Sequence, residues 1–163
     1  MRELTQTSVH PAIGNCWQTC VACLLDLDPE VMPPQAEYDW RRTNEDGSVE
    51  YGPAYHNALM GYLRRHHDLT YVEISSPEEL LPSLRVAEPG WHMMTGRTVR
   101  SDALDGARHV VVARYGEMVW DPHPSRAGLL EEIRWAFLVP FPKLWAESRN
   151  ICVCPACKPG KPI

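Results

Sequence analysis

The longest run of apolar positions in the chain extends from Trp17 to Leu27, where apolar residues occupy nearly every side of a helix. A helix with this pattern is buried rather than laid on a surface. Gly14 permits a sharp turn before it, and Asn15 is a favourable N-cap residue. The pattern therefore predicts a buried helix whose first turn contains Cys16.

Further along the chain, apolar residues at helical spacing predict a second helix over residues 53–67. Positive charge at its C-terminal end suits the helix dipole. Two shorter helices are predicted to begin at Asp28 and at Ser76, because each is followed by a proline at the first helical position. The stretch from Gln35 to Gly52 is polar and irregular, and we expect it to form a loop beside a cleft.

The remaining patterns predict β-strands. Residues 69–74 alternate in polarity, and further strands are expected near 91–95 and over 133–139. Two β-rich runs within residues 109–124, joined across Gly116-Glu117, predict a hairpin. The chain is therefore expected to adopt an α+β fold in which the N-terminal helix packs on an antiparallel sheet.

Composition and charge bound the class of function. The 163 residues suffice for one domain, which we place at residues 1–139, and an apolar content of 44% supplies an ordinary core. A net charge of -5 and a pI near 5.8 argue against a nucleic-acid partner. Neither a signal peptide nor an apolar run of about 20 residues is evident, so we expect a cytoplasmic protein without a membrane partner.

The six cysteines form two groups, a placement that does not suggest a disulfide framework. Cys16 lies at the positive end of the first helix, where unpaired backbone N–H groups favour the thiolate, the nucleophilic form. Cys20 and Cys23 follow on the same helical face and are expected to pack in the core.

The second group of cysteines lies in the tail, residues 140–163, which is rich in Pro, Lys and Cys and is expected to have little regular structure. Cys152, Cys154 and Cys157 are weak candidates for a zinc site. A closed zinc site needs four ligands, and only one pair here has the Cys-x2-Cys spacing. A flexible reactive tail is the alternative, and no other cofactor is expected.

A thiol nucleophile needs a base and a group that orients the base, and His109 and Asp121 fit these roles. They begin and end the same predicted hairpin, so register decides whether they meet. A three-residue loop at 115–117 puts both on one face, whereas a two-residue turn at Gly116-Glu117 separates them. The hypothesis predicts an odd-length loop or a bulge, with Gly116 left-handed. In that register Val111 and Ala113 would share the face of His109 and admit the Cys16 helix.

These segments resemble those of a known family. Gly14-Asn15-Cys16 opening an apolar helix, followed by His109 at a strand start and by Asp121-Pro122 at the end of the next strand, resembles the papain-like cysteine peptidase superfamily. The likeness extends to small bacterial and phage proteins related to the peptidase domains that trim bacteriocin leaders. The resemblance implies a papain-like α+β fold and a Cys16-His109-Asp121 triad.

The resemblance also implies a side chain that donates to the oxyanion, in the superfamily a glutamine upstream of the cysteine. Gln6 lies ten positions before Cys16, and Asn15 and Gln18 are the substitutes. The backbone N–H of Cys16 would complete the oxyanion hole in each case.

Together the residues and the resemblance predict a thiol-dependent hydrolase that acts on a peptide, isopeptide or other small amide through an acyl-enzyme. One alternative is an acyltransferase, transglutaminase-like, that uses the same triad on an amine. The other is a non-catalytic phage-type protein that binds a host factor in the cytoplasm of an infected bacterium.

Overall fold

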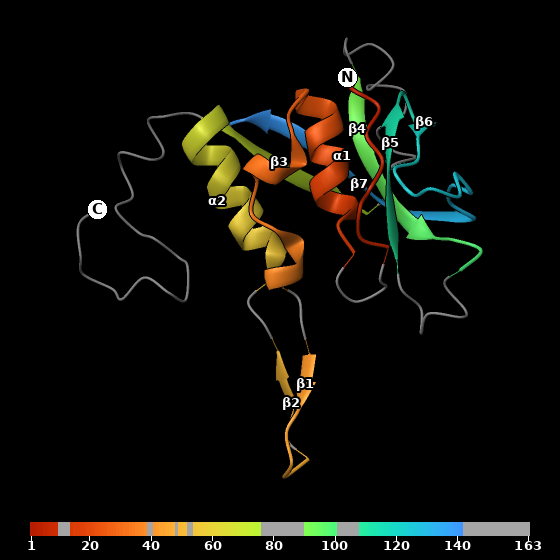
Figure 1. Ribbon diagram of the computed structural model, residues 1–163. Coiled ribbons are helices and arrows are strands. Elements are labelled where there is room, and N and C mark those ends of the chain that lie inside the picture. The colour runs from red at the N-terminus through yellow and green to blue at the C-terminus, as the bar shows by residue number, and fades with distance from the viewer. Residues whose placement is uncertain are drawn as a thin grey trace.

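The computed structural model describes residues 1–9, 14–38, 41–47, 49–51, 54–75, 90–100 and 108–141. Within these ranges the chain forms an α+β fold of two α-helices and a five-stranded antiparallel sheet, with a separate two-stranded hairpin (Figure 1). In chain order the elements are α1 (Cys16–Leu25), the 3-10 turns η1 (Pro29–Val31) and η2 (Gln35–Glu37), β1 (Arg41–Thr43), β2 (Val49–Tyr51), α2 (Tyr55–His67), β3 (Leu69–Ile74), β4 (Trp91–Arg97), β5 (His109–Arg114), β6 (Glu117–Trp120) and β7 (Glu131–Pro140). No described helix is long and apolar enough to cross a membrane.

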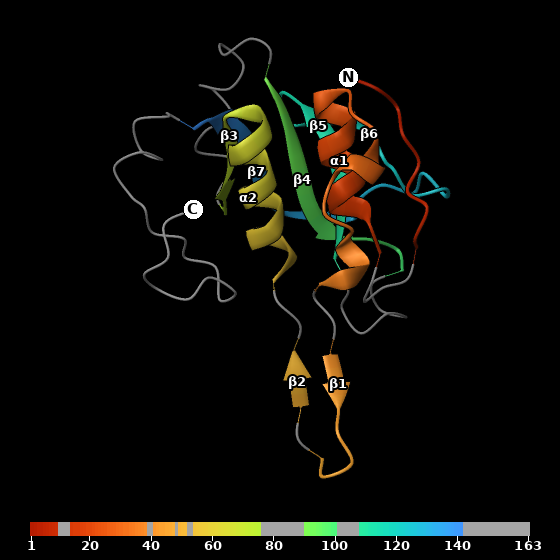
Figure 2. The ribbon, with the colours of Figure 1, turned by 60° about the vertical axis from the view of Figure 1, so that its left-hand side comes forward.

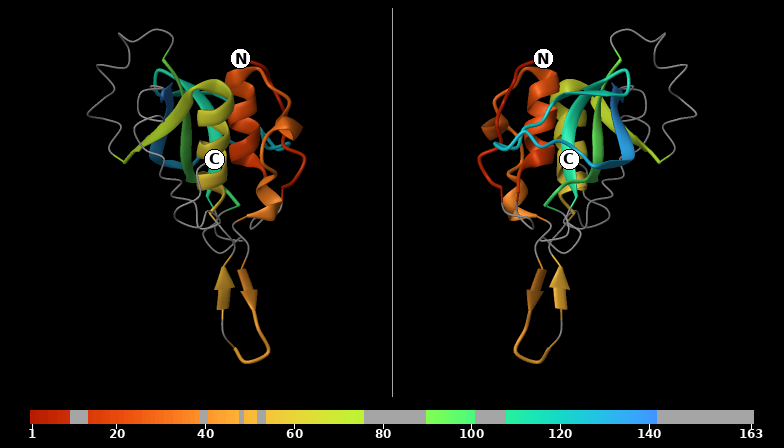
Figure 3. Two further views of the ribbon diagram at one scale, coloured as in Figure 1. Left: turned by 90° about the vertical axis from the view of Figure 1, so that its left-hand side faces the viewer. Right: turned by 90° about the vertical axis from the view of Figure 1, so that its right-hand side faces the viewer.

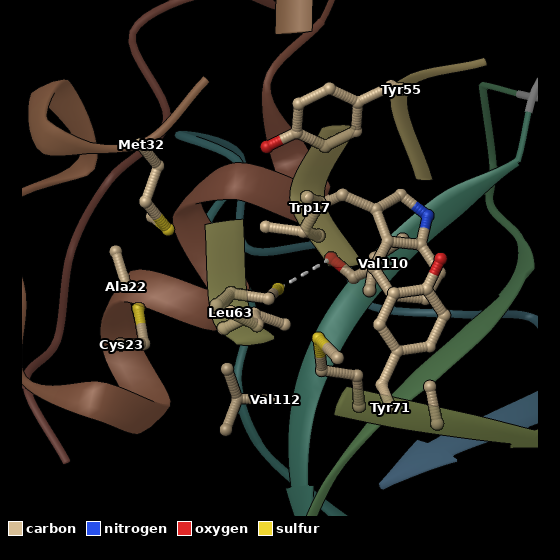
Figure 4. Close-up of a cluster of buried hydrophobic side chains, with 14 residues drawn as sticks. Trp17, Ala22, Cys23, Met32, Tyr55, Leu63, Tyr71, Val110 and Val112 are labelled. Atoms are coloured by element: carbon tan, nitrogen blue, oxygen red, sulfur yellow. Dashed lines mark hydrogen bonds between the residues drawn. The ribbon is translucent and has the colours of Figure 1, made fainter. Parts of the chain in front are cut away.

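The large sheet has the strand order β3-β7-β4-β5-β6, and every neighbouring pair is antiparallel. Both helices cover one face of this sheet (Figures 2 and 3). The main core lies between the helices and the sheet, where Trp17, Leu63, Val110 and Val112 pack together (Figure 4). The N-terminal helix thus packs on the antiparallel sheet, as the sequence predicted.

Helix α1 confirms the predicted buried helix and begins at Cys16. All seven residues from Trp17 to Cys23 are buried. Asn15 occupies the N-cap position as predicted, but its side chain makes no capping hydrogen bond. Asn15 instead accepts from the backbone N–H of Ser8 (3.1 Å) and donates to the hydroxyl of Thr7 (3.1 Å). This residue therefore joins the start of the helix to the preceding segment.

The stretch from 35 to 52 is more regular than predicted. It contains the turn η2 and a hairpin in which Arg41 pairs with Tyr51 and Thr43 with Val49. The hairpin projects from the body of the molecule, at the end of the sheet where β4 ends and β5 begins (Figures 1 and 2). The helix predicted at Ser76 and the tail from 142 onward lie outside the described residues. The short helix predicted at Asp28 is limited to the three-residue 3-10 turn η1.

The β5–β6 hairpin has the triad-compatible register, reached through a bulge. The loop is the two-residue turn Tyr115-Gly116, with φ of 54° and 80°, so Gly116 is left-handed as predicted. Arg114 pairs with Glu117, but Val112 pairs with Trp120, because the register shifts between Val112 and Ala113. The three-residue loop would also have paired Val112 with Trp120. The extra residue thus sits in strand β6 rather than in the turn.

The prediction of which face meets the Cys16 helix is wrong. Val110 and Val112 pack against α1, whereas Val111 and Ala113 belong to a smaller cluster on the opposite face with Trp135. Side chains therefore alternate between the two faces of β5 as predicted, but the helix covers the even-numbered residues rather than the odd-numbered ones. Cys16 and His109 are the first residues of α1 and β5, so they meet at the end of the interface between helix and sheet rather than within it.

Candidate active site

The three residues proposed as a triad meet at the end of the sheet where β5 begins. Nε2 of His109 donates to Oδ1 of Asp121 at 2.6 Å, and both side chains are buried. The thiol of Cys16 lies beside the same imidazole, where it raises the pKa of His109. Since Nε2 is taken by Asp121, Nδ1 is the ring nitrogen left to interact with the thiol. Cys16 itself is half-buried and so remains accessible.

A local irregularity accompanies the position of His109. Its partner across the ladder, Gly96, follows a register shift between Thr95 and Gly96 in the pairing of β4 with β7. Bulges twist a strand and redirect its side chains, and they often occur beside functional sites. The irregularity thus lies in the strand next to His109.

The electrostatics of His109 favour its protonated form. Burial by itself would lower the pKa, but hydrogen bonds to Asp121 and Cys16 and the charge of Asp121 outweigh burial and raise the pKa of His109 to about 9. At neutral pH the ring is therefore an imidazolium in contact with a thiol. A cationic partner of this kind stabilises a thiolate.

The carboxylate of Asp121 is fully engaged. Oδ1 accepts from His109 and from the backbone N–H of His123 (2.8 Å), and Oδ2 accepts from the backbone N–H of Gly128 (2.8 Å). Burial raises its pKa, but these hydrogen bonds prevail and lower the pKa of Asp121 to about 2. The guanidinium of Arg126 donates to the backbone carbonyl of Asp121. The loop after β6 is thus wrapped around one ionised carboxylate.

The N-terminal strap, residues 2–8, runs along α1 and reaches this loop. The hydrogen bonds that hold it include Arg2 N to Cys23 O (2.9 Å), Trp120 Nε1 to Leu4 O (2.8 Å), Arg126 Nη2 to Thr5 Oγ1 (2.6 Å) and Gln6 N to Pro122 O (2.9 Å). The last of these places Gln6 beside the residue that follows Asp121.

The three oxyanion candidates differ in their surroundings. Gln6 is buried, its Nε2 donates to Ser8 O (2.8 Å), and its Oε1 has no partner among the described residues. Gln18 is held elsewhere, because its Nε2 donates to Pro29 O (2.6 Å) and its Oε1 accepts from Gln35 N (3.4 Å). Asn15 uses both ends of its amide on the strap. Gln6 is therefore the candidate whose backbone bonds to the residue after Asp121 and whose side-chain amide is only partly engaged among the described residues.

The other two cysteines of α1 lie in the core. Cys20 and Cys23 have no exposed area, and Sγ of Cys20 donates to the carbonyl of Val110 at 3.4 Å (Figure 4). Burial raises the pKa of both thiols. Both thiols therefore remain protonated at neutral pH.

Three polar residues beside the triad were not assigned a role from the sequence. The ring of His123 meets that of His109 edge-on, with centroids 5.9 Å apart. Nδ1 of His123 accepts from Nη1 of Arg100 (3.0 Å) and from the backbone N–H of Ser125 (3.0 Å). Arg100 follows β4 and lies more than twenty residues from His123, so only the folded sheet reveals their contact.

A groove of about 520 Å³ runs between the strap and the turns η1 and η2. Asn15 and Gln18 line it, but Cys16 and His109 do not. The groove therefore reaches the start of α1 without containing the thiol. We assign it no part in the chemistry.

In the part of the chain that the structure describes, no group of three or more His, Cys, Asp or Glu side chains could hold a metal ion. The zinc candidates Cys152, Cys154 and Cys157 lie outside that part. Comparison with known proteins finds no matching family, no similar curated protein and no similar solved structure. Any statement of function therefore depends on the geometry of this chain.

Proposed function

We propose that the protein is a thiol-dependent hydrolase of peptide, isopeptide or other amide bonds, with Cys16, His109 and Asp121 as its catalytic triad. The observation that carries the proposal is the position of His109, which contacts Cys16 on one side and the buried carboxylate of Asp121 on the other. A nucleophile, a base and an orienting group in this order are the arrangement that nucleophilic catalysis requires.

The proposed reaction follows from these contacts. The thiolate of Cys16 attacks the carbonyl carbon, and as the C–N bond breaks, Nδ1 of His109 gives its proton to the leaving amine. Water then attacks the thioester and gives a proton to His109, and the acid leaves as the thiolate is restored. Asp121 keeps the ring oriented throughout by accepting from Nε2.

The negative oxygen formed in each step needs hydrogen-bond donors. We assign this task to the backbone N–H of Cys16 at the first turn of α1 and to the side-chain amide of Gln6. An amide nitrogen carries two hydrogens, and Ser8 takes one from Gln6. The fold is consistent with a papain-like assignment, because a buried helix that begins with the proposed nucleophile packs on an antiparallel sheet that carries the proposed base.

Alkylation with iodoacetamide tests the proposal. At pH 7, Cys16 should react at least about 10-fold faster than the thiol of glutathione, and His109→Gln should remove this advantage. The matched control is His66→Gln, because His66 is exposed on α2 and only packs on Tyr62. Mass spectrometry of peptides identifies the alkylated cysteine. Slow alkylation of Cys16, or equal rates in the two variants, would overturn the proposal.

Substrate turnover gives a second measurement. A library of fluorogenic peptides and isopeptides should be cleaved by the wild type and not by Cys16→Ser. Product masses in the presence of glycine ethyl ester separate hydrolysis from transfer to an amine. We expect the free acid as the main product, and a dominant amide product would identify an acyltransferase instead.

A further inference from the structure

Positive charge gathers beside the triad. Arg100 contacts the ring of His123, Arg126 donates to the backbone carbonyl of Asp121, and the protonated His109 donates to the carboxylate of Asp121. His123 lies among these three cations. Burial lowers the pKa of His123 most, and the charges of Arg100, His109 and Arg126 lower it further. The chain as a whole has a net charge of -5, so this end of the sheet differs from the rest.

The two guanidinium groups do not have equal roles. Arg126 is a structural residue, because it bonds to Asp121 O and Thr5 Oγ1 and lies over the ring of Trp120. Arg100 is half-buried and touches only neutral groups among the described residues, namely His123 and Ser125. Both of these contacts use Nη1, which leaves Nη2 and Nε, one edge of the fork that binds a carboxylate with two hydrogen bonds.

Arg100 is also held in place. Its backbone N–H donates to the hydroxyl of Thr98 (3.0 Å), and Nη1 is fixed by His123, whose ring packs on that of His109. The guanidinium therefore lies two side chains from the thiol of Cys16. A group on the substrate that reached it would lie at the same end of the sheet as the bond under attack.

We propose that Arg100 makes this site selective for a substrate with a carboxylate next to the scissile amide. This inference rests on the proposed function, because it assumes that Cys16 is the nucleophile. The carboxylate belongs either to an acidic side chain or to the C-terminus of the substrate, and the two sources share the same recognition by a guanidinium fork.

Two alkylating reagents of the same shape measure the effect. The ratio of Cys16 rates with iodoacetate and iodoacetamide should fall about 2–5-fold in Arg100→Gln at low salt, and the difference should shrink at about 0.5 M salt. The rate with neutral iodoacetamide should be unchanged. The matched control is Arg97→Gln, because Arg97 also lies at the end of β4 but is exposed and lies 4.0 Å from Glu131. Equal ratios in the two variants would overturn the inference.

Protection of Cys16 from iodoacetamide distinguishes the sources. N-acetylglutamic acid α-amide offers only a side-chain carboxylate, N-acetylglutamine only a terminal one, and N-acetylglutamine amide neither. At least one of the acids should protect the wild type better than the neutral amide does, and not Arg100→Gln; equal protection by all three would overturn the inference. A low rate with iodoacetamide alone would count against the proposed function. In that case the NMR resonances of the His123 ring are followed while the same compounds are added. Shifts caused by an acid in the wild type but not in Arg100→Gln support the inference, and the absence of such shifts overturns it.

Discussion

Asp121 is the residue on which the geometry of the site depends most. Its carboxylate accepts three hydrogen bonds, from His109, His123 and Gly128, and is almost fully buried. Asp121→Asn keeps the shape but turns an amide N–H toward one of these donors, so it should lower the free energy of unfolding by about 2–4 kcal/mol. Urea unfolding at pH 7 measures this cost.

The control for this substitution is Glu73→Gln, which breaks the pair with Arg134 at 3.7 Å. That pair is partly exposed, and its loss should cost less than about 1 kcal/mol because water screens it. A similar cost for both substitutions would show that the hydrogen bonds to Asp121 are not a main support of the site.

At the residue scale the sequence was informative where chemistry depends on local context. Cys16 was found from the turn and helix around it, and His109 and Asp121 from a hairpin of known periodicity. Arg100 and Arg126 could not be found in this way. Arg126 reaches Thr5, across almost the whole chain, and no pattern in a single sequence encodes such a contact.

At the element scale the same hairpin shows what a pattern can and cannot specify. The demand that His109 and Asp121 share a face predicted an odd loop or a bulge, and the bulge in β6 is what the structure contains. The hairpin β1–β2 was not predicted, because β1 is wholly polar and each strand has only three residues, too few to show a clear alternation. Short strands of this kind are specified by their turn and pairing rather than by burial.

Two glycines, Gly61 and Gly128, should differ in how well they tolerate substitution by alanine. Gly61 lies inside α2, where an added Cβ would meet only the flexible guanidinium of Arg65 at 3.3 Å. Gly61→Ala should therefore stabilise the protein by about 0.5–1 kcal/mol. Gly128 has a φ of 68°, and its Cβ would lie 3.0 Å from Met118 beside the carboxylate of Asp121.

Gly128→Ala should consequently destabilise the protein by about 1–2 kcal/mol, since it combines backbone strain with a close contact. Thermal unfolding of the two variants beside the wild type measures both effects. Shifts of the midpoint in the same direction would contradict the assigned backbone conformations.

At the scale of the whole molecule, the predicted layers were confirmed but their contacts were not all foreseen. Helix α1 lies on the antiparallel sheet as expected, yet it covers Val110 and Val112 rather than Val111 and Ala113. Alternation separates two faces without saying which one a helix will cover when both are apolar. The contacts of the N-terminal strap were not foreseen either, because residues 2–8 show no clear pattern of apolar and polar positions.

The His109–Asp121 pair should also shape how stability depends on pH. The folded state raises the pKa of His109 from 6.5 to about 9, so it binds a proton that the unfolded chain loses above about pH 6.5. This contribution is full below about pH 6.5 and is lost as pH rises through about 9, by about 3 kcal/mol in all. For Asp121, lowered from 3.8 to about 2, the contribution is present above about pH 3.8 and is lost as pH falls toward 2.

Urea unfolding between pH 3 and pH 10 therefore should show a maximum of stability between about pH 4 and pH 6.5. In His109→Gln the decline between about pH 6.5 and 9 should largely disappear, because the group that binds the extra proton is gone. His66→Gln should keep that decline, since its ring is exposed and remote from Asp121. If the two variants lose stability in parallel above pH 6.5, the proton on His109 is not held by Asp121 and Cys16, and the charge state assigned to the site would have to be abandoned.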